Sequence, residues 1–188
     1  MHNTALHNGE KFVNKYTLPL EGKKVIDLGS MDNNGSLKPF FEKANYIGVD
    51  MTAGNSVDIV ANNHDIPFKD NYFDICISTS CFEHDDMFWV TFLEMCRIVK
   101  PGGLIYLNVP STGEYHGFPG DCWRFYLDSY EALGKWAIKN NYGIKLLESY
   151  VDDTDYAQPE NWLYDSQIGK NGPQVNQYHD CVGIFQML

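Results

Sequence analysis

The stretch that decides the fold runs from Val25 to Ser36 and reads Val-Ile-Asp-Leu-Gly-Ser-Met-Asp-Asn-Asn-Gly-Ser. Its short apolar start follows two lysines and ends at Gly29, which predicts a parallel strand covered on both faces. The glycine-containing turn after it lets the backbone approach a ligand closely, and a helix is predicted to follow. Open α/β sheets bind their ligands at such strand ends.

A second strand end points to the same ligand. Nineteen to twenty residues further on, Tyr46–Val49 forms an apolar strand that ends at Asp50. A carboxylate at this place can accept hydrogen bonds from both hydroxyls of a ribose. The two strand ends together therefore predict a nucleoside ligand.

The composition predicts one soluble, cytoplasmic domain over residues 1–188, with 44% hydrophobic and 21% charged residues. A formal net charge of −11 argues against sequence-independent nucleic-acid binding, which needs lysines and arginines to neutralise phosphates. Five scattered cysteines contain no C-x-x-C pair, so neither a disulfide framework nor a zinc knuckle is indicated. No signal peptide or membrane-spanning run is apparent, so no membrane insertion is expected.

Strand and helix patterns alternate along the chain, which predicts a parallel sheet with crossover helices. A leading helix is predicted over residues 8–17, with an apolar face that could lie over the ligand. The other predicted helices lie near 35–44, 87–99 and 128–141, and the predicted strands are 24–28, 46–50, 57–60, 73–78, 103–109, 144–151 and 180–188.

The last two predicted strands, 144–151 and 180–188, are joined by a polar segment without a helical pattern, so they are expected to be antiparallel neighbours. The fold class is therefore α/β: a Rossmann-like, doubly wound, seven-stranded sheet, mostly parallel with an antiparallel C-terminal strand. This arrangement differs from that of a dinucleotide-binding dehydrogenase.

The sequence resembles the class I S-adenosylmethionine-dependent methyltransferases, and within them small bacterial-type enzymes whose first loop reads G-S-x-D-x-N-G-S. Six motifs in order carry the resemblance over nearly the whole chain. They are Gly29–Ser36, Tyr46–Asp50, Asp65–Phe68 with Tyr72–Asp74, Ser80–His84 with Val99–Gly103, Gly120–Tyr126 and Asp180–Phe185. The resemblance implies S-adenosyl-L-methionine as cofactor and S-adenosyl-L-homocysteine as product.

The resemblance also implies a role for each cofactor-binding residue. The amino-acid end of the cofactor should meet Asp27, Gly29 and Ser30, and Gly35 should supply flexibility because Met31 and Asn33 occupy positions where glycines are common. Asp50 should bind the ribose, Met51 should pack on the adenine face, and Ser80 should line the methionine side. The adenine edge should be read by His64, Asp65 and Ile66, the last through its N–H. Taken singly, Asp27 and Asp50 could instead be a turn cap and a surface acid.

The segment from Ser111 to Tyr126 leaves the end of strand 103–109 and is the best candidate for acceptor binding and catalysis. His116 is the preferred general base, with His84 and Asp121 as further catalytic candidates; Tyr115, Trp123 and Arg124 are candidate acceptor-binding residues. The plainer interpretation is that Asp121 and Arg124 form a structural ion pair, Trp123 fills the core and His84 caps a helix. No metal site is expected, because Cys81, Glu83 and His84 lack a second ligand pair at a matching spacing.

Two insertions on the acceptor side are expected, at about 111–127 and 152–179. The second carries Asp152, Asp153 and Asp155 followed by Tyr156, Trp162 and Tyr164, which predicts a cover over the pocket or a plain solvated lid. The acids favour a neutral or cationic acceptor, while Arg124 and Lys170 leave anionic acceptors possible.

The predicted function is methyl transfer from S-adenosylmethionine to oxygen or nitrogen of a small-molecule or glycan-type acceptor by a monomer or homodimer. One alternative is a nucleoside-cofactor-binding protein without transferase activity. Another is an NAD-dependent oxidoreductase, which the absence of G-x-G-x-x-G disfavours.

Overall fold

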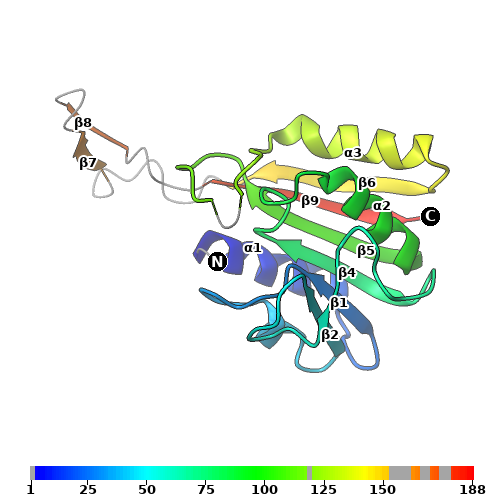
Figure 1. Ribbon diagram of the computed structural model, residues 1–188. Coiled ribbons are helices and arrows are strands. Elements are labelled where there is room, and N and C mark those ends of the chain that lie inside the picture. The colour runs from blue at the N-terminus through cyan, green and yellow to red at the C-terminus, as the bar shows by residue number, and fades with distance from the viewer. Residues whose placement is uncertain (1–2, 118–119, 153–161, 166–169, 174–178) are drawn as a thin grey trace.

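The computed structural model describes all residues except 1–2, 118–119, 153–161, 166–169 and 174–178 (Figure 1). Its main sheet has seven strands in the order β3-β2-β1-β4-β5-β9-β6. The strands are β1 (Lys24–Leu28), β2 (Asn45–Asp50), β3 (Ile59–Val60), β4 (Phe73–Thr79), β5 (Val99–Pro110), β6 (Ile144–Val151) and β9 (Asp180–Met187). A separate two-stranded sheet pairs β7 (Trp162–Asp165) with β8 (Lys170–Pro173).

The pairing confirms the predicted Rossmann-like topology. β3, β2, β1, β4 and β5 pair in parallel, whereas β9 lies between β5 and β6 and is antiparallel to both. The chain passes from β1 outward through β2 and β3 and then returns to β4 on the other side of β1. The carboxyl ends of β1 and β4 therefore flank the topological switch point, which is where open α/β sheets bind ligands.

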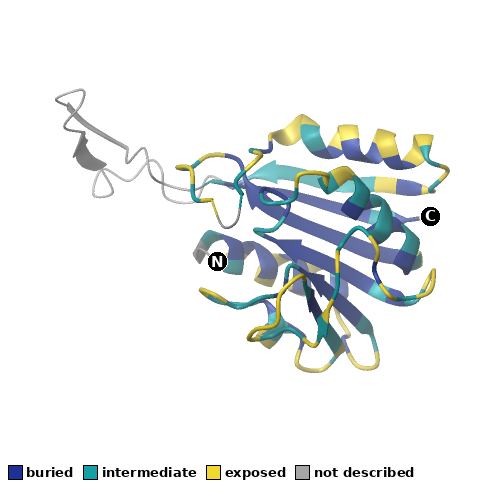
Figure 2. Cartoon of the chain, viewed as in Figure 1, coloured by how far each residue is buried: buried dark blue, intermediate teal, exposed yellow. Residues whose placement is uncertain are grey.

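Helices cover the sheet on both faces (Figure 1). α2 (Phe88–Ile98) and α3 (Leu127–Lys139) bury Phe92, Met95 and Leu133 in one apolar core. α1 (Asn3–Phe12) and the π-helical turn η1 (Val13–Thr17) cover the other face, where the Phe12 ring stacks on Tyr106 at 4.6 Å between centroids. Figure 2 shows the inner strands as buried and β6 as only partly covered.

The helix predicted near 35–44 is wrong. Only a 3-10 turn, η2 (Lys38–Phe41), forms there, because Pro39 lacks a backbone N–H and β2 begins within a few residues of the turn. Gly35 does adopt a positive φ of 117°, and its N–H donates to Asp32 Oδ1 at 2.7 Å. The loop after β1 is thus held by side-chain capping instead of by a helix N-terminus.

Other differences concern element ends. The leading helix begins at Asn3, earlier than predicted. Its Phe12 packs on the sheet, and its first half lies beside the carboxyl end of β5. Its Asn8 Nδ2 donates to Asn108 Oδ1 at 3.1 Å and to Asp152 Oδ2 at 2.9 Å, and Thr4 Oγ1 donates to Asp180 Oδ2 at 2.8 Å.

In the part of the chain that the structure describes, no helix has both the length and the apolarity needed to cross a membrane.

Candidate active site

Gly29 sits at the switch point, directly after β1. Its φ is +79°, and its N–H donates to the Val49 carbonyl oxygen at 2.9 Å, which ties the turn to β2. A Cβ at this position would lie 2.5 Å from Cys81 Sγ, which follows the end of β4. Glycine is therefore required here both by the backbone conformation and by the close approach of the two strand ends.

Gly29→Ala is expected to lower the free energy of unfolding by roughly 1–3 kcal/mol from the left-handed backbone, with a further loss from the Cys81 clash. Gly22→Ala is the matched control, since Gly22 has a φ of +77° and nothing within 4 Å of its added Cβ. Urea unfolding of both variants checks this. Equal losses in the two variants would show that the Cys81 contact contributes nothing.

Asp50 ends β2 and turns its carboxylate toward the loop that follows β1. Its Oδ2 accepts from the Met31 N–H at 3.3 Å, and its Oδ1 accepts from the Thr52 N–H at 3.0 Å. The next residue, Met51, is 68% exposed although its side chain is apolar. An acid and an open apolar side chain thus stand together at one strand end.

Asp27 is buried within β1, 5% exposed, and accepts a short hydrogen bond from the Tyr46 hydroxyl. Burial raises the pKa of Asp27 to about 7, with a smaller contribution from the charge of Asp50, while the Tyr46 hydrogen bond opposes the rise. The site therefore holds a carboxyl group poised to ionise when a cation is placed beside it.

Three buried polar atoms near the ends of β1 and β4 lack a hydrogen-bond partner among the described residues: Ser30 Oγ, Asn63 Oδ1 and Thr79 Oγ1. Ser30 is 4% exposed, and Asn63 Nδ2 contacts Cys81 Sγ at 3.7 Å. Unsatisfied buried oxygens are uncommon in folded proteins and call for a ligand or water. Ser80, at the end of β4 with a φ of 50°, completes this edge, and its N–H donates to Asn108 O.

The adenine-reading role predicted for Ile66 is wrong. Its N–H donates to Glu94 Oε2 at 2.9 Å and its side chain is buried in the core, so neither is available to a ligand. Within the same segment, His64 Nε2 is 2.8 Å from Asp85 Oδ1, and Asp65 is exposed. Asn63 is the residue that sequence reasoning missed here, because only the fold reveals its unpartnered oxygen.

A second group of side chains gathers where the segments after β4 and β5 meet. Glu83 Oε1 lies 3.6 Å from His84 Nε2 and 3.9 Å from His116 Nε2. The two imidazole rings are perpendicular, with centroids 5.0 Å apart. His116 Nδ1 in turn lies 3.2 Å from Asp121 Oδ2, whose carboxylate also accepts from the His116 backbone N–H at 2.8 Å. The structure thus brings together the three predicted catalytic candidates.

Glu83 lies at the centre of this group, and sequence reasoning did not assign it a role. It is 1% exposed, and burial raises the pKa of its carboxyl to about 8. Its Oε2 has no hydrogen-bond partner among the described residues. The spacing argument against a metal also missed that His116, 32 residues beyond His84, supplies a third nearby donor.

Arg124 lies on Asp121, as the structural ion-pair interpretation predicted. Both guanidinium NH groups donate to that carboxylate, and NH2 also donates to Glu114 O at 2.9 Å. The hydrogen bond from Arg124 lowers the pKa of Asp121 to about 2 despite burial. Arg124 therefore positions Asp121, and its predicted contact with an acceptor has no support in this geometry. Tyr115 is 77% and Trp123 37% exposed, so these two rings are open to an acceptor.

The segment expected to cover the pocket begins differently from its prediction. Asp152 is 4% exposed and bound to Asn8 of α1, so it anchors a helix instead of lining a pocket mouth. Residues Asp153, Asp155 and Tyr156 lie outside the described residues. Trp162, Tyr164 and Lys170 belong to β7 and β8, but their side chains also lie outside the description.

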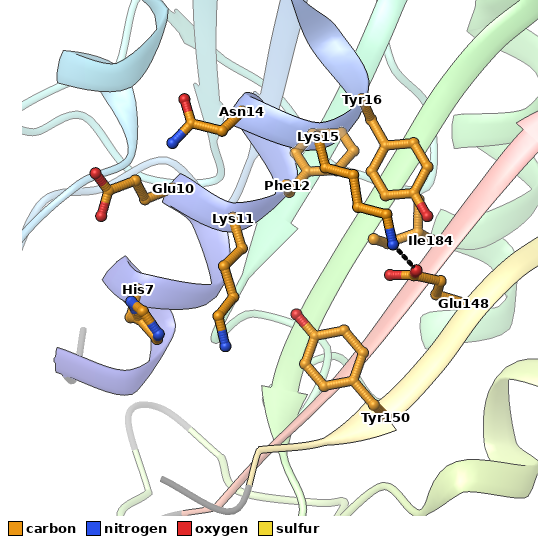
Figure 3. A pocket seen from close by; sticks show the side chains of 10 residues that line it. All are labelled: His7, Glu10, Lys11, Phe12, Asn14, Lys15, Tyr16, Glu148, Tyr150 and Ile184. Atoms are coloured by element: carbon orange, nitrogen blue, oxygen red, sulfur yellow. Dashed lines mark hydrogen bonds and ion pairs between the residues drawn. The ribbon is translucent and has the colours of Figure 1, made fainter.

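A pocket of about 620 Å³ opens elsewhere, between α1, η1 and β6 (Figure 3). Lys15 spans it to pair with Glu148, while Lys11 and Tyr150 also line it. Its residues come from the helical face and the β6 edge of the sheet. It is therefore separate from the switch point formed by the ends of β1 and β4.

Known proteins agree with this geometry. Residues 29–107 match the methyltransferase domain family, a range that runs from the switch-point glycine into β5. This match identifies residues 29–107 as a methyltransferase domain. The family match supports S-adenosylmethionine as the cofactor, and a neighbour in fold was solved with S-adenosylhomocysteine. The matched range includes Gly29, Asp50 and Ser80 of the strand ends described above, and it begins two residues after Asp27.

Curated relatives of this chain include mycobacterial proteins. An uncharacterized methyltransferase of Mycobacterium tuberculosis is 28% identical over 168 residues, covering 76% of this chain and 63% of the relative. One from Mycobacterium avium is 29% identical over 157 residues, covering 70% of this chain and 59% of the relative. The match thus spans less than two thirds of these relatives' length.

Solved structures show the same fold. The YcgJ protein of Bacillus subtilis superposes with a TM-score of 0.66 at 15% identity, covering 96% of this methyltransferase and 97% of that chain. The 1,6-didemethyltoxoflavin-N1-methyltransferase of Burkholderia thailandensis, solved with S-adenosylhomocysteine, gives 0.65 at 12% identity, covering 97% of this chain and 78% of that one. At these identities the likeness concerns the fold alone.

Proposed function

We propose that this protein transfers the methyl group of S-adenosylmethionine to an oxygen or nitrogen of a polar small-molecule or glycan-type acceptor. The observation that carries the proposal is the convergence of Gly29, Asp50 and the unpartnered oxygens of Ser30 and Asn63 at the β1/β4 switch point. S-adenosylmethionine offers complementary groups: an ammonium, a ribose diol and an exocyclic amine.

Each part of the cofactor has a partner in this proposal. Asp27 attracts the ammonium, and Ser30 Oγ donates to the carboxylate, which would satisfy its unpartnered hydroxyl. Asp50 accepts from the ribose hydroxyls and Met51 covers one face of adenine. Asn63 Oδ1 accepts from the exocyclic amine of adenine, and Ile66 takes no part because its N–H is bound to Glu94.

The sulfonium makes the methyl group electrophilic, so the protein mainly needs to align the acceptor with it and remove a proton. His116 is the proposed base. Its Nδ1 is held by the Asp121 carboxylate, which is ionised because Arg124 lowers its pKa, and this leaves Nε2 to take the proton. The exposed rings of Tyr115 and Trp123 stand close along the chain and offer surfaces for packing an acceptor.

Isothermal titration with S-adenosylmethionine and S-adenosylhomocysteine, with NADH as control, tests the proposal. Micromolar binding of the first two alone supports it, and methyl transfer to any acceptor in a screen with labelled cofactor then separates an enzyme from a binding protein. Preference for NADH would overturn the proposal in favour of an oxidoreductase.

Asp50→Ala is expected to weaken S-adenosylhomocysteine binding by roughly 1.5–3 kcal/mol, because charge-assisted hydrogen bonds to the ribose are lost. Calorimetry measures this, and Asp128→Ala, which removes an exposed acid from the first turn of α3, is the matched control. Unchanged affinity in the Asp50 variant would place the ribose elsewhere.

A further inference from the structure

We propose that Glu83, His84 and His116 form a binding site for a divalent zinc-type cation. One oxygen or nitrogen from each of the three side chains lies within 4.8 Å of the others. The carboxylate of Glu83 faces the two Nε2 atoms at 3.6 and 3.9 Å. Donor atoms around a tetrahedral zinc are about 3.3 Å apart, so the two glutamate–histidine distances are within a few tenths of an ångström of those in a closed site. The two histidine nitrogens, which lie within 4.8 Å of each other, would move together on binding.

The outer hydrogen bonds of both histidines favour this use. His84 Nδ1 is hydrogen-bonded to the Gly120 carbonyl oxygen, and His116 Nδ1 lies near Glu114 O at 3.1 Å and Asp121 Oδ2 at 3.2 Å. These oxygens are closer than the Arg124 NH2 donor at 3.4 Å, so they favour the tautomer with the proton on Nδ1 and the lone pair on Nε2. Metal-binding histidines have just this support from carbonyl or carboxylate oxygens.

The carboxylate supplies an independent observation. Glu83 is 1% exposed, and its Oε2 has no hydrogen-bond partner among the described residues. A buried carboxylate without such bonds is costly unless it is paired or coordinates a metal. The guanidinium NH groups of Arg124 donate to Asp121, so the charge of Arg124 acts on Glu83 without a described hydrogen bond between them.

The protein holds the three residues in place from two distant segments. The Glu83 carbonyl oxygen accepts from the Cys122 N–H at 2.6 Å, and Trp123 Nε1 donates to Asp85 O at 2.9 Å. These bonds, with the one between His84 and Gly120, fasten the segment after β5 to the turn after β4. The histidine side chains are 20% and 34% exposed, so an ion can enter from their side.

The donor set indicates which ion fits. Two imidazoles and one carboxylate match zinc sites that keep a fourth position open for water or substrate, whereas magnesium and calcium prefer oxygen donors alone. An ion between the ends of β4 and β5 is placed to bind the acceptor's oxygen or nitrogen and lower its pKa; this role, unlike the site itself, rests on the proposed methyl transfer.

Calorimetric titration of the chelator-treated full chain with ZnCl2 tests the site, and the visible spectrum of the Co2+ form reports the coordination. We expect one Zn2+ per chain at micromolar or lower Kd and no response to Mg2+. His116→Ala and Glu83→Gln should each lower the affinity by roughly 100-fold or more, and Asp121→Asn by about 10- to 100-fold.

His64→Ala is the matched control, because His64 lies in a second cluster with Asp85 and Asp86 but is already hydrogen-bonded to Asp85. It should leave zinc binding unchanged. Asp50→Ala should also bind zinc normally, which separates failure of the metal site from failure of cofactor binding. Absence of stoichiometric binding by the wild type, or equal affinity in a His116→Ala variant with a native circular-dichroism spectrum, would overturn the proposal.

Discussion

Replacing His116 with alanine is expected to lower kcat by roughly 10²- to 10⁴-fold, the usual contribution of a positioned general base. The affinity for S-adenosylhomocysteine should stay unchanged, because His116 is held by Glu83 and Asp121, neither of which is assigned to the cofactor. Single-turnover assays with labelled cofactor and calorimetry measure the two quantities separately.

His7→Ala removes a histidine from the distant pocket beside α1 and serves as control. It should retain full turnover. A His116→Ala enzyme with wild-type kcat on its true acceptor would exclude His116 from the reaction. Chelator treatment separates the two proposed uses of His116 Nε2. If Nε2 is the general base, the metal-free enzyme should keep its turnover. If Nε2 binds zinc, turnover should be lost on chelation and should return when zinc is added.

Ionisation of Asp27 is expected to lower the free energy of unfolding by up to ~4 kcal/mol as the pH rises from 4 to 7, given the rise of its pKa from 3.8 to about 7. In this window the native state holds a proton on Asp27 that the unfolded chain has already lost. Stability must therefore fall with increasing pH and level off above about pH 7.

Asp27→Asn isolates this effect, since an amide oxygen can still accept from the Tyr46 hydroxyl. The variant should match the wild type near pH 4 and exceed it in stability at pH 8, while binding S-adenosylmethionine more weakly because the ammonium loses its carboxylate. Urea unfolding across this pH range measures the first effect. Identical pH profiles for the two proteins would show that the pKa of Asp27 is the same in the native state as in the unfolded chain.

Local sequence patterns were sufficient for the strands of the main sheet. Val25–Leu28 and Phe73–Ser78 are mostly apolar runs, which predicted inner strands. No helical pattern precedes residues 180–188, which predicted that this last strand runs antiparallel to its neighbours. The prediction of a helix near 35–44 was wrong because it did not take into account Pro39 and the early start of β2.

The sequence by itself determined the fold class and the strand ends that carry Asp27, Gly29 and Asp50. These features depend on local patterns: an apolar run predicts a buried strand, and a glycine or an acid a few residues away marks where that strand ends. The tertiary structure alone decided which polar atoms are left for ligands. The N–H of Ile66 is hydrogen-bonded to Glu94, 28 residues away, and is therefore not available to a ligand. His116 lies close to Glu83 only because the loops after β4 and β5 are hydrogen-bonded to each other. Such pairings depend on loop conformations and burial, which no local spacing encodes.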